Sequence, residues 1–365
     1  MSTRLSVRRA LRGVDRGSLA LVGLSGGADS LALAAALAAE AHALGIRAGA
    51  LVVDHGLQAR SVEVAEIAAS QARGLGLDPV LVTRVRVSEE LTQREGPESA
   101  AREARYEAFR EAAEQTGAAV LLTAHTRDDQ AEQVLLALSR GSGTRSVSGI
   151  PPIRPLTDRT KLVRPFLAEA PEIRRATTEA ACAELGLHPW HDPHNLDDAY
   201  ARVRVRERLL PALETELGGG VAGGLAQSAD LAREDADALD AWAERVAYEV
   251  VGVNGAALST DGSSTGVGSG AGESGPAATI APDGVAALAA LPAAVRQRVI
   301  HTAAKRVFGS PLTRTHVLAI AALITEWKGQ GPVFVPGIRV TRADGALVFE
   351  RQHGSPRQSA AEATS

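Results

Sequence analysis

Hydrophobic and polar positions alternate in a regular way between residues 18 and 210. Short runs of branched and aliphatic residues predict strands at 19–24, 48–53, 80–87 and 120–123. The longer alanine-rich segments between and after them predict helices at 30–44, 62–75, 98–115 and 127–139. Strands that alternate with helices are typical of a parallel sheet with helices on both faces. We therefore expect an α/β fold of the Rossmann-like kind in this part of the chain.

The pattern changes beyond Pro211. Residues 213–251 read as one or two helices, which glycines at 218–220 and 223–224 interrupt. A Gly/Ser/Thr-rich stretch follows, and then two helices, 288–308 and 313–327, and a hairpin formed by 333–335 and 347–349. This order predicts a catalytic domain at 1–212, a helical linker at 213–253, a flexible insertion at 254–280, a smaller, mainly helical C-terminal domain at 281–352 and a disordered tail at 353–365.

Three polar segments come directly after predicted strands. They are Ser25-Gly26-Gly27, Asp54-His55-Gly56 and Ala124-His125-Thr126. Ligands of open α/β sheets bind at the carboxyl ends of the strands. The three segments are therefore expected to meet at one crevice.

The segment SGGADS at 25–30 links a predicted strand to a predicted helix. Its backbone N–H groups and the helix N-terminus can bind an oxyanion, and Gly26 and Gly27 permit a tight turn and close approach of a ligand. The hydroxyls of Ser25 and Ser30 can donate hydrogen bonds, and Asp29 can hold Mg²⁺ against phosphates. The Walker A lysine and the G-x-G-x-x-G spacing are both absent. The alternative is an ordinary glycine-rich turn.

Three acids, Asp128, Asp129 and Glu132, open the predicted helix 127–139. We expect its buried stripe to consist of Ala131, Val134, Leu135 and Leu138. The acids then face the crevice, where they can hold Mg²⁺ or a cationic amino group, and one can assist in deprotonating that group. The alternative is that they only complement the helix dipole.

Arginines gather near the end of the first domain. Arg202, Arg204 and Arg206 alternate as in a strand. With Arg164, Arg174 and Arg175 they can form a local phosphate-binding patch, and a solvated charged face is an equally good interpretation.

Composition narrows the class of protein. The net charge of −4 disfavours a generally basic nucleic-acid binder. Cys182 is the single cysteine, so the chain has no internal disulfide, as expected in a reducing cytosol. Apolar runs are all shorter than the roughly 18 residues of a membrane span. We therefore expect a cytoplasmic protein that does not contact a membrane.

The SGGADS loop resembles the pyrophosphate loop of the N-type ATP pyrophosphatases, the PP-loop superfamily. Other segments narrow the resemblance to the tRNA(Ile)-lysidine synthase family over residues 18–210. These segments are 53–57 (VDHGL), 98–106 (ESAAREARY), 125–132 (HTRDDQAE), 192–195 (DPHN), and Tyr200 with the three alternating arginines. The chain departs from the family pattern at His194, where a small polar residue is usual, and at Val203, where asparagine is usual.

The resemblance implies that ATP adenylates O2 of cytidine 34 in the CAU anticodon of tRNA(Ile) and that free L-lysine then displaces AMP. The product, lysidine, switches codon recognition from AUG to AUA. ATP would be bound by Ser25, Gly26, Gly27, Ala28, Asp29, Ser30, Val53 and His55. The catalytic residues would be Asp29, Asp128, Asp129 and Glu132, with Mg²⁺ on Asp29. The tRNA would be bound by the C-terminal domain and by Arg102, Arg105, Arg164, Arg202, Arg204 and Arg206.

Two other functions remain open at this point. A PP-loop tRNA thiolase would adenylate a base and add sulfur, although those that use a cluster or a cysteine pair need more than Cys182. An ATP-sensing binding module would hold the nucleotide without turnover. The sequence does not decide the oligomeric state and leaves a homodimer open.

Overall fold

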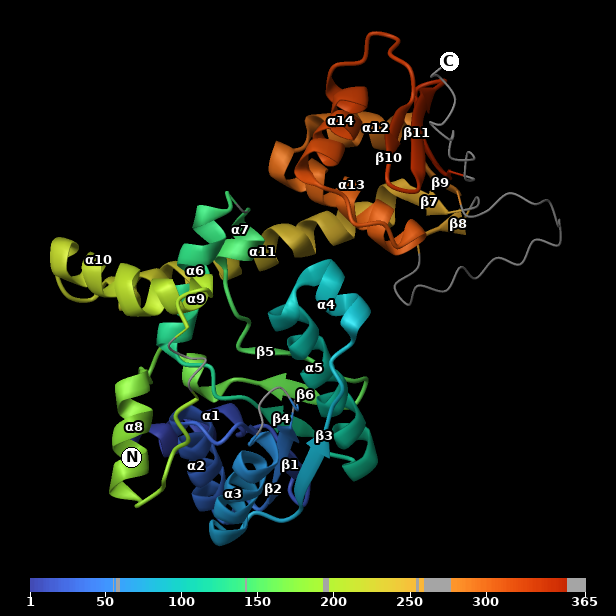
Figure 1. The fold of residues 1–365 in the computed structure, drawn as a ribbon. Coiled ribbons are helices and arrows are strands. Elements are labelled where there is room, and N and C mark those ends of the chain that lie inside the picture. The colour runs from blue at the N-terminus through green and yellow to red at the C-terminus, as the bar shows by residue number, and fades with distance from the viewer. Residues whose placement is uncertain are drawn as a thin grey trace, which may run out of the picture. The chain divides into compact units, whose positions relative to one another are not determined.

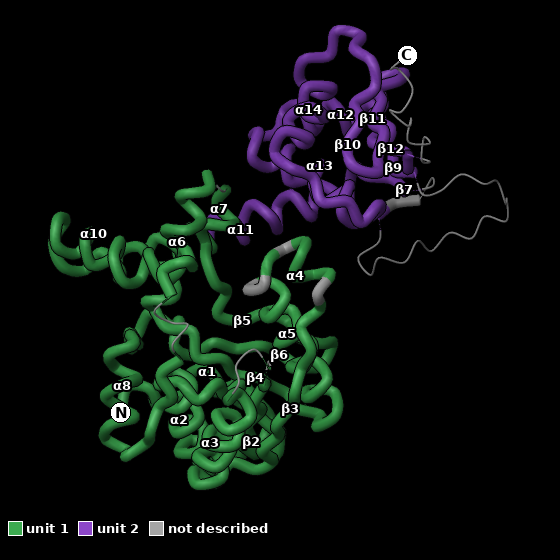
Figure 2. The backbone as a smooth tube through the Cα atoms, viewed as in Figure 1, with its two compact units in different colours: residues 1–233 green, residues 234–365 purple. Residues whose placement is uncertain are grey.

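The computed structural model describes residues 1–54, 56, 60–141, 143–192, 197–253, 256–258 and 277–352. The chain divides into two compact units, Met1–Arg233 and Glu234–Ser365 (Figure 2). Most of the predicted insertion and the whole predicted tail lie outside the described residues. The five-part domain division proposed from the sequence stays a prediction.

A six-stranded sheet forms the centre of the first unit, in the order β3-β2-β1-β4-β6-β5 (Figure 1). The strands are β1 Leu19–Leu24, β2 Arg47–Asp54, β3 Val80–Arg84, β4 Val120–Leu122, β5 Ile153–Pro155 and β6 Lys161–Val163. All neighbours pair in parallel except β5, which is antiparallel to β6. The predicted α/β fold is confirmed, and an antiparallel edge strand is added to it.

Within the described residues up to Glu184, the α-helices are α1 Ser2–Ala10, α2 Ala28–Leu44, α3 Ser61–Gly74, α4 Glu89–Glu95, α5 Pro97–Thr116, α6 Arg127–Ser139, α7 Thr144–Val147 and α8 Arg175–Glu184. Four of them, α2, α3, α5 and α6, match predicted helices. The others are short and carry no long apolar stripe, so the hydrophobic pattern did not indicate them.

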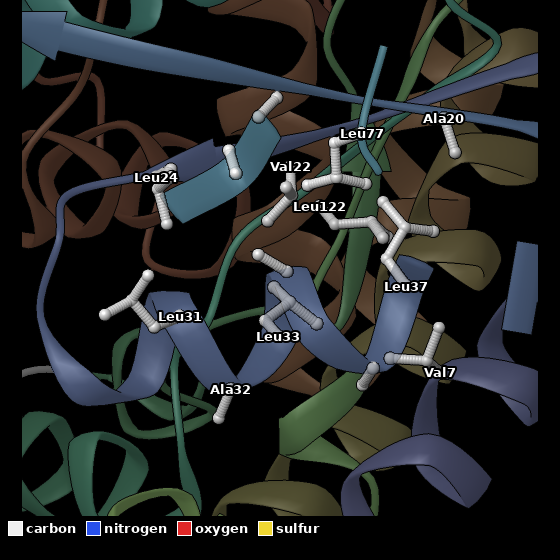
Figure 3. Close-up of a cluster of buried hydrophobic side chains, with 14 of the residues drawn as sticks. Val7, Ala20, Val22, Leu24, Leu31, Ala32, Leu33, Leu37, Leu77 and Leu122 are labelled. Atoms are coloured by element: carbon white, nitrogen blue, oxygen red, sulfur yellow. The ribbon is translucent and has the colours of Figure 1, made fainter. Parts of the chain in front are cut away.

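Alternate residues of the strands enter two different apolar layers. Ala20 and Val22 of β1 pack with α2 in one layer, which Figure 3 shows together with Leu122 of β4. Leu19 and Leu21 of the same strand pack with α5 in the other layer. Both faces of the sheet are covered, which is why these strands read as continuous apolar runs.

The arginine-rich segment at the end of this unit is helical, and the predicted strand alternation is wrong. Residues 201–217 form α9 Ala201–Arg204, a π-helical turn Val205–Leu209 and α10 Leu210–Leu217. Val205 and Leu210 are buried against Ala131 of α6, so the apolar spacing here serves a helix face.

A long helix, α11 Val221–Val250, follows, and the boundary between the two units falls within it. The glycines at 218 and 220 adopt positive φ angles of 88° and 101° and separate α10 from α11. Gly223 and Gly224 lie inside α11, so the second predicted interruption does not occur.

The second unit packs helices against a six-stranded antiparallel sheet with the order β10-β11-β12-β9-β7-β8. Its elements are β7 Val251–Val253, β8 Ala256–Ala257, β9 Ala277–Ile280, α12 Pro282–Ala290, α13 Ala293–Phe308, α14 Arg314–Thr325, β10 Val333–Val335, β11 Ile338–Ala343 and β12 Ala346–Arg351. The predicted hairpin is only one part of this sheet. Strands β7 to β9 are two to four residues long, too short to show a period-two pattern.

No helix within the described ranges combines the length and the apolar character that crossing a bilayer requires.

Candidate active site

A cavity of about 390 Å³ opens at the carboxyl ends of β1, β2 and β4. Ser25 and Asp29 line it after β1, Val53 and Asp54 at the end of β2, and His125 after β4. The sequence predicted that these segments meet at one crevice, and the structure confirms it. His55, the other residue predicted at the end of β2, lies outside the described residues.

The loop between β1 and α2 is folded by its own hydroxyl groups. The hydroxyl of Ser30 accepts the backbone N–H of Ser25 at 3.2 Å and donates to the carbonyl of Gly27 at 3.0 Å. Gly26 has a φ of +84°, which side chains other than glycine rarely adopt. Gly27 caps α2 with an extended backbone. This geometry leaves the helix N-terminus beside the cavity, as an oxyanion site requires.

Asp29 is the second residue of α2, and its carboxyl group contacts a hydroxyl and an arginine. Thr178 of α8 donates its hydroxyl to Oδ1, and Arg175 Nε lies 4.0 Å from Oδ2. Burial, together with the nearby Asp129, raises the pKa of Asp29 to about 6. This carboxyl group therefore titrates near physiological pH in the folded protein.

The three acids of α6 have different surroundings. Asp128 Oδ2 accepts the backbone N–H of Arg175 at 2.7 Å, so it caps the first turn of α8. Asp129 Oδ2 accepts the backbone N–H of Thr126 at 2.8 Å, while its Oδ1 lies 3.6 Å from Arg175 Nη2. Asp129 is the member of the trio that lines the cavity. The predicted alternative, stabilisation of the start of α6, thus describes one oxygen of Asp129, whereas Asp128 caps α8.

Glu132 is completely buried, and arginine side chains surround its carboxylate. Arg206 of the π-helical turn donates to both oxygens, from Nε at 2.8 Å and from Nη2 at 3.1 Å. Arg175 Nη2 lies 3.4 Å away and Arg202 Nε 3.8 Å away. Glu132 therefore forms the centre of an ionic cluster with these three arginines.

The buried stripe predicted for α6 is wrong in part. Ala131 and Val134 are buried as expected, but Leu138 is 52% exposed and Glu132 is not exposed at all. The π-helical turn covers the acidic side of α6 and buries Glu132 beneath arginines, which the apolar period of α6 alone could not indicate.

The predicted RNA-binding arginines of the helical segment and of α5 lie in three kinds of surroundings. Arg202 donates to the Gln133 side chain at 2.8 Å, and Arg206 to Glu132, so both turn inward. Arg204 is exposed and donates to the carbonyls of Asp198 and Ala199. Arg102 and Arg105 line the cavity. Contact of these residues with RNA stays a prediction.

Arg206→Glu is expected to lower the melting temperature by several degrees, because it places a second carboxylate against the buried Glu132. Arg204→Glu, on the same stretch of helix but exposed, is the matched control and should melt like wild type. Thermal unfolding of the two variants compares them directly. Equal melting temperatures would contradict the ionic cluster.

His125 and Tyr106 complete the wall of the cavity. Burial, reinforced by neighbouring arginines, lowers the pKa of His125 to about 3. The imidazole is therefore neutral at physiological pH, and its Nδ1 lies 3.2 Å from the Thr123 hydroxyl. Tyr106 of α5 packs edge-on against Phe109 and presents its hydroxyl to two arginines.

Sequence reasoning missed several residues of the site. Trp190 lines the cavity and donates its backbone N–H to the Gly26 carbonyl at 2.9 Å. Thr178 holds Asp29 from 149 positions away in the chain. Neither belongs to a local motif, and only the packing of α8 and the following segment against the loop brings them to the site.

This site is that of a PP-loop protein. It consists of a strand, a glycine turn with a serine hydroxyl at each end, and an acid on the following helix. The family models agree. Residues 5–213 match the PP-loop domain, and residues 285–348 match the TilS substrate binding domain.

Curated relatives narrow the class further. The chain is 54% identical over 333 residues to the tRNA(Ile)-lysidine synthase of Leifsonia xyli subsp. xyli, covering 91% of this chain and 90% of that protein. It is 46% identical over 349 residues to the enzyme of the same name from Thermobifida fusca, covering 94% and 95%. The chain belongs to the tRNA(Ile)-lysidine synthase family, as the resemblance of its motifs predicted.

A solved structure has a related fold. The U34-tRNA thiolase NcsA from Methanococcus maripaludis with its [4Fe-4S] cluster superposes with a TM-score of 0.50 at 18% identity, over 63% of this chain and 78% of that chain. At this identity the likeness concerns the fold alone.

Proposed function

We propose that this enzyme ligates L-lysine to C2 of cytidine 34 in the CAU anticodon of tRNA(Ile), using ATP. The O2 atom of the cytidine attacks the α-phosphorus, and the bond to pyrophosphate breaks. The ε-nitrogen of lysine then attacks C2, the C2–O2 bond breaks, and AMP leaves with that oxygen. The observation that carries the proposal is that the PP-loop residues Ser25 and Asp29 and the acid Asp129 line one cavity in a chain of this family.

ATP would place its pyrophosphate on the loop 25–30 and its adenine beside Val53 and His55. The N-terminus of α2 and the Ser25 hydroxyl supply donors for the charge that develops as pyrophosphate leaves. Mg²⁺ fits this site because it commonly takes one or two carboxylates together with phosphate oxygens. Asp29, with Asp129 nearby, offers that donor set, while no group of three or more metal-ligating side chains occurs among the described residues. Bound Mg²⁺ would neutralise the leaving group.

Lysine needs a carboxylate for its ε-ammonium and a base for one of its protons. Asp129 supports this role best, because it is the acid of the trio that lines the cavity, while Asp128 caps α8 and Glu132 is buried against Arg206. Glu132 would contribute indirectly, because it holds Arg206 and Arg175 near Asp129. Of the three acids expected from the sequence to be catalytic, we therefore propose that Asp129 alone contacts lysine.

A tRNA thiolase is disfavoured by the single cysteine. Cys182 is 1% exposed, and burial raises the pKa of its thiol to about 11. The reactive form of cysteine is the thiolate, so this side chain is a poor sulfur nucleophile.

Pyrophosphate release should require ATP and minor isoleucine tRNA, and formation of lysidine with release of AMP should require lysine as well. Methionine tRNA, which has the same anticodon triplet, should not replace the isoleucine tRNA, and the product RNA should gain the mass of a lysyl residue at one cytidine. An ATP sensor would show no tRNA-dependent turnover. A thiolase would need a sulfur donor instead of lysine. Either result would overturn the proposal.

A further inference from the structure

Three arginines surround the side chain of Tyr106. Arg102 Nη2 and Arg164 Nη2 both donate to the tyrosine hydroxyl at 3.1 Å. The guanidinium carbons of Arg102 and Arg154 lie over the tyrosine ring, 4.9 and 4.5 Å from its centroid. We call these four residues the Tyr106 arginine cluster. They come from α5, from β5 and from the residue that follows β6.

Among the side chains that the structure describes, the cluster has positive charge without a matching carboxylate. None of its arginines lies within ion-pair distance of a described acid, whereas Arg127 and Arg206 both form ion pairs. Arg164 is only 2% exposed; it donates to the Pro151 carbonyl and to Tyr106, but its Nε is buried without a hydrogen-bond partner. Burying a cation without a counter-charge is costly, and a bound anion would offset this cost.

The cluster borders the cavity on the β4 and β6 side of the sheet. Arg102 and Tyr106 line the cavity directly, and Arg154 and Arg164 lie against the tyrosine. Ser25 and Val53 line the same cavity, and Val53 packs against the apolar layer that contains Tyr106, so a nucleotide bound there would lie close to the cluster. The cytidine must approach that nucleotide to react, which would bring a neighbouring phosphodiester within reach of the cluster.

We propose that the Tyr106 arginine cluster binds one phosphodiester group of the RNA next to the reacting cytidine. This inference rests on the proposed function and names a specific contact within it. Phosphate suits paired guanidinium groups, which bind two oxygens at once. Because the Tyr106 oxygen accepts from two arginines, its own hydrogen is free to donate to a phosphate oxygen.

The α-carboxylate of lysine is the less suitable occupant. That carboxylate has an ammonium group on the neighbouring carbon, and three guanidinium groups would repel this ammonium. A phosphodiester has no such adjacent cation.

Arg154→Gln tests the proposal, with Arg159→Gln as the matched control. Arg159 is exposed between β5 and β6, so the control removes the same charge from the same segment. The probe is an anticodon stem-loop of tRNA(Ile) and a series in which one linkage at a time is a neutral methylphosphonate. Arg154→Gln should weaken binding of the unmodified RNA about tenfold and reduce the salt slope by about one released counterion.

One neutral linkage beside cytidine 34 should weaken wild type by a similar factor and have no further effect on Arg154→Gln. Tyr106→Phe, which keeps the ring, should lose part of the same affinity. The proposal is overturned if Arg154→Gln binds the unmodified RNA like wild type, or if every linkage weakens both proteins equally. It is also overturned if the KM for lysine or ATP rises while RNA affinity is unchanged.

Failure of the proposed function gives a different result. Wild type would then show no tRNA-dependent AMP release, and both proposals would fall together. An active wild type with an unaffected Arg154→Gln variant overturns only the assignment of the cluster.

Discussion

Asp29→Asn should abolish AMP formation, with a loss of about 100-fold or more, and leave the protein at least as stable as wild type at pH 7. The loss is expected because the negative charge that would hold Mg²⁺ against the pyrophosphate disappears. The fold should survive because the Oδ1 atom of asparagine can still accept the Thr178 hydroxyl. Asp29 also lies on the first turn of α2, beside the cavity and away from the apolar layers.

The pH dependence of this effect has a definite sign. The folded pKa of Asp29 is raised from 3.8 to about 6, so the folded state holds a proton that the unfolded chain releases. Asp29 therefore does not affect stability below pH 4, and its unfavourable contribution grows as pH rises from 4 to 6. At roughly 1.4 kcal/mol per pKa unit, the full contribution above pH 6 is about 3 kcal/mol. Asp29→Asn should remove it.

Thermal unfolding between pH 4 and pH 8, together with AMP formation, checks both parts. Ser25→Ala is the matched control, because it removes a donor from the same loop without removing a charge. It should also lose AMP formation but keep the wild-type dependence of stability on pH. Wild-type turnover by either variant would show that the loop does not bind the phosphates.

The phosphate loop could be predicted from the sequence because its interactions are local. Ser25, Gly26 and Ser30 lie within six positions, and their turn needs only the strand before them and the helix after them. The crevice was predictable for a related reason, since parallel strands bring their carboxyl ends to one edge. Neither inference depended on how distant segments pack.

The ionic surroundings of the site could not be predicted in this way. Glu132 contacts Arg206 across 74 positions, and Arg164 reaches Tyr106 across 58. The arginine alternation at 202–206 predicted a strand, but these residues are helical, and Val205 is buried against α6. Pairings of this kind depend on tertiary packing. The apolar periodicity of a segment contains no information about which distant charges it will meet.

Asp129→Asn should separate the two steps of the reaction. The amide can still accept the Thr126 N–H, so α6 keeps its start, but the negative charge facing the cavity is lost. Pyrophosphate release in the presence of tRNA should continue, because the loop 25–30 is intact. Lysidine formation should fall by about 100-fold or more, because the lysine ammonium loses its partner and its base. Adenylated tRNA should therefore accumulate or hydrolyse, and trapping it with labelled ATP is the decisive measurement.

The two other acids of the trio provide the controls for this experiment. Asp128→Asn should behave like wild type, because an amide oxygen can accept the Arg175 backbone N–H as well as a carboxylate can. Glu132→Gln should instead lower the free energy of unfolding, by about 3 kcal/mol, because it removes the carboxylate that pairs with the partly buried Arg206 and leaves only Asp129 Oδ1, 3.7 Å away. If Asp129→Asn stops pyrophosphate release as well, Asp129 acts with Asp29 on Mg²⁺ and not on lysine. If all three variants match wild type in activity and stability, the cluster serves only the helix start, and the lysine site must lie elsewhere in the cavity.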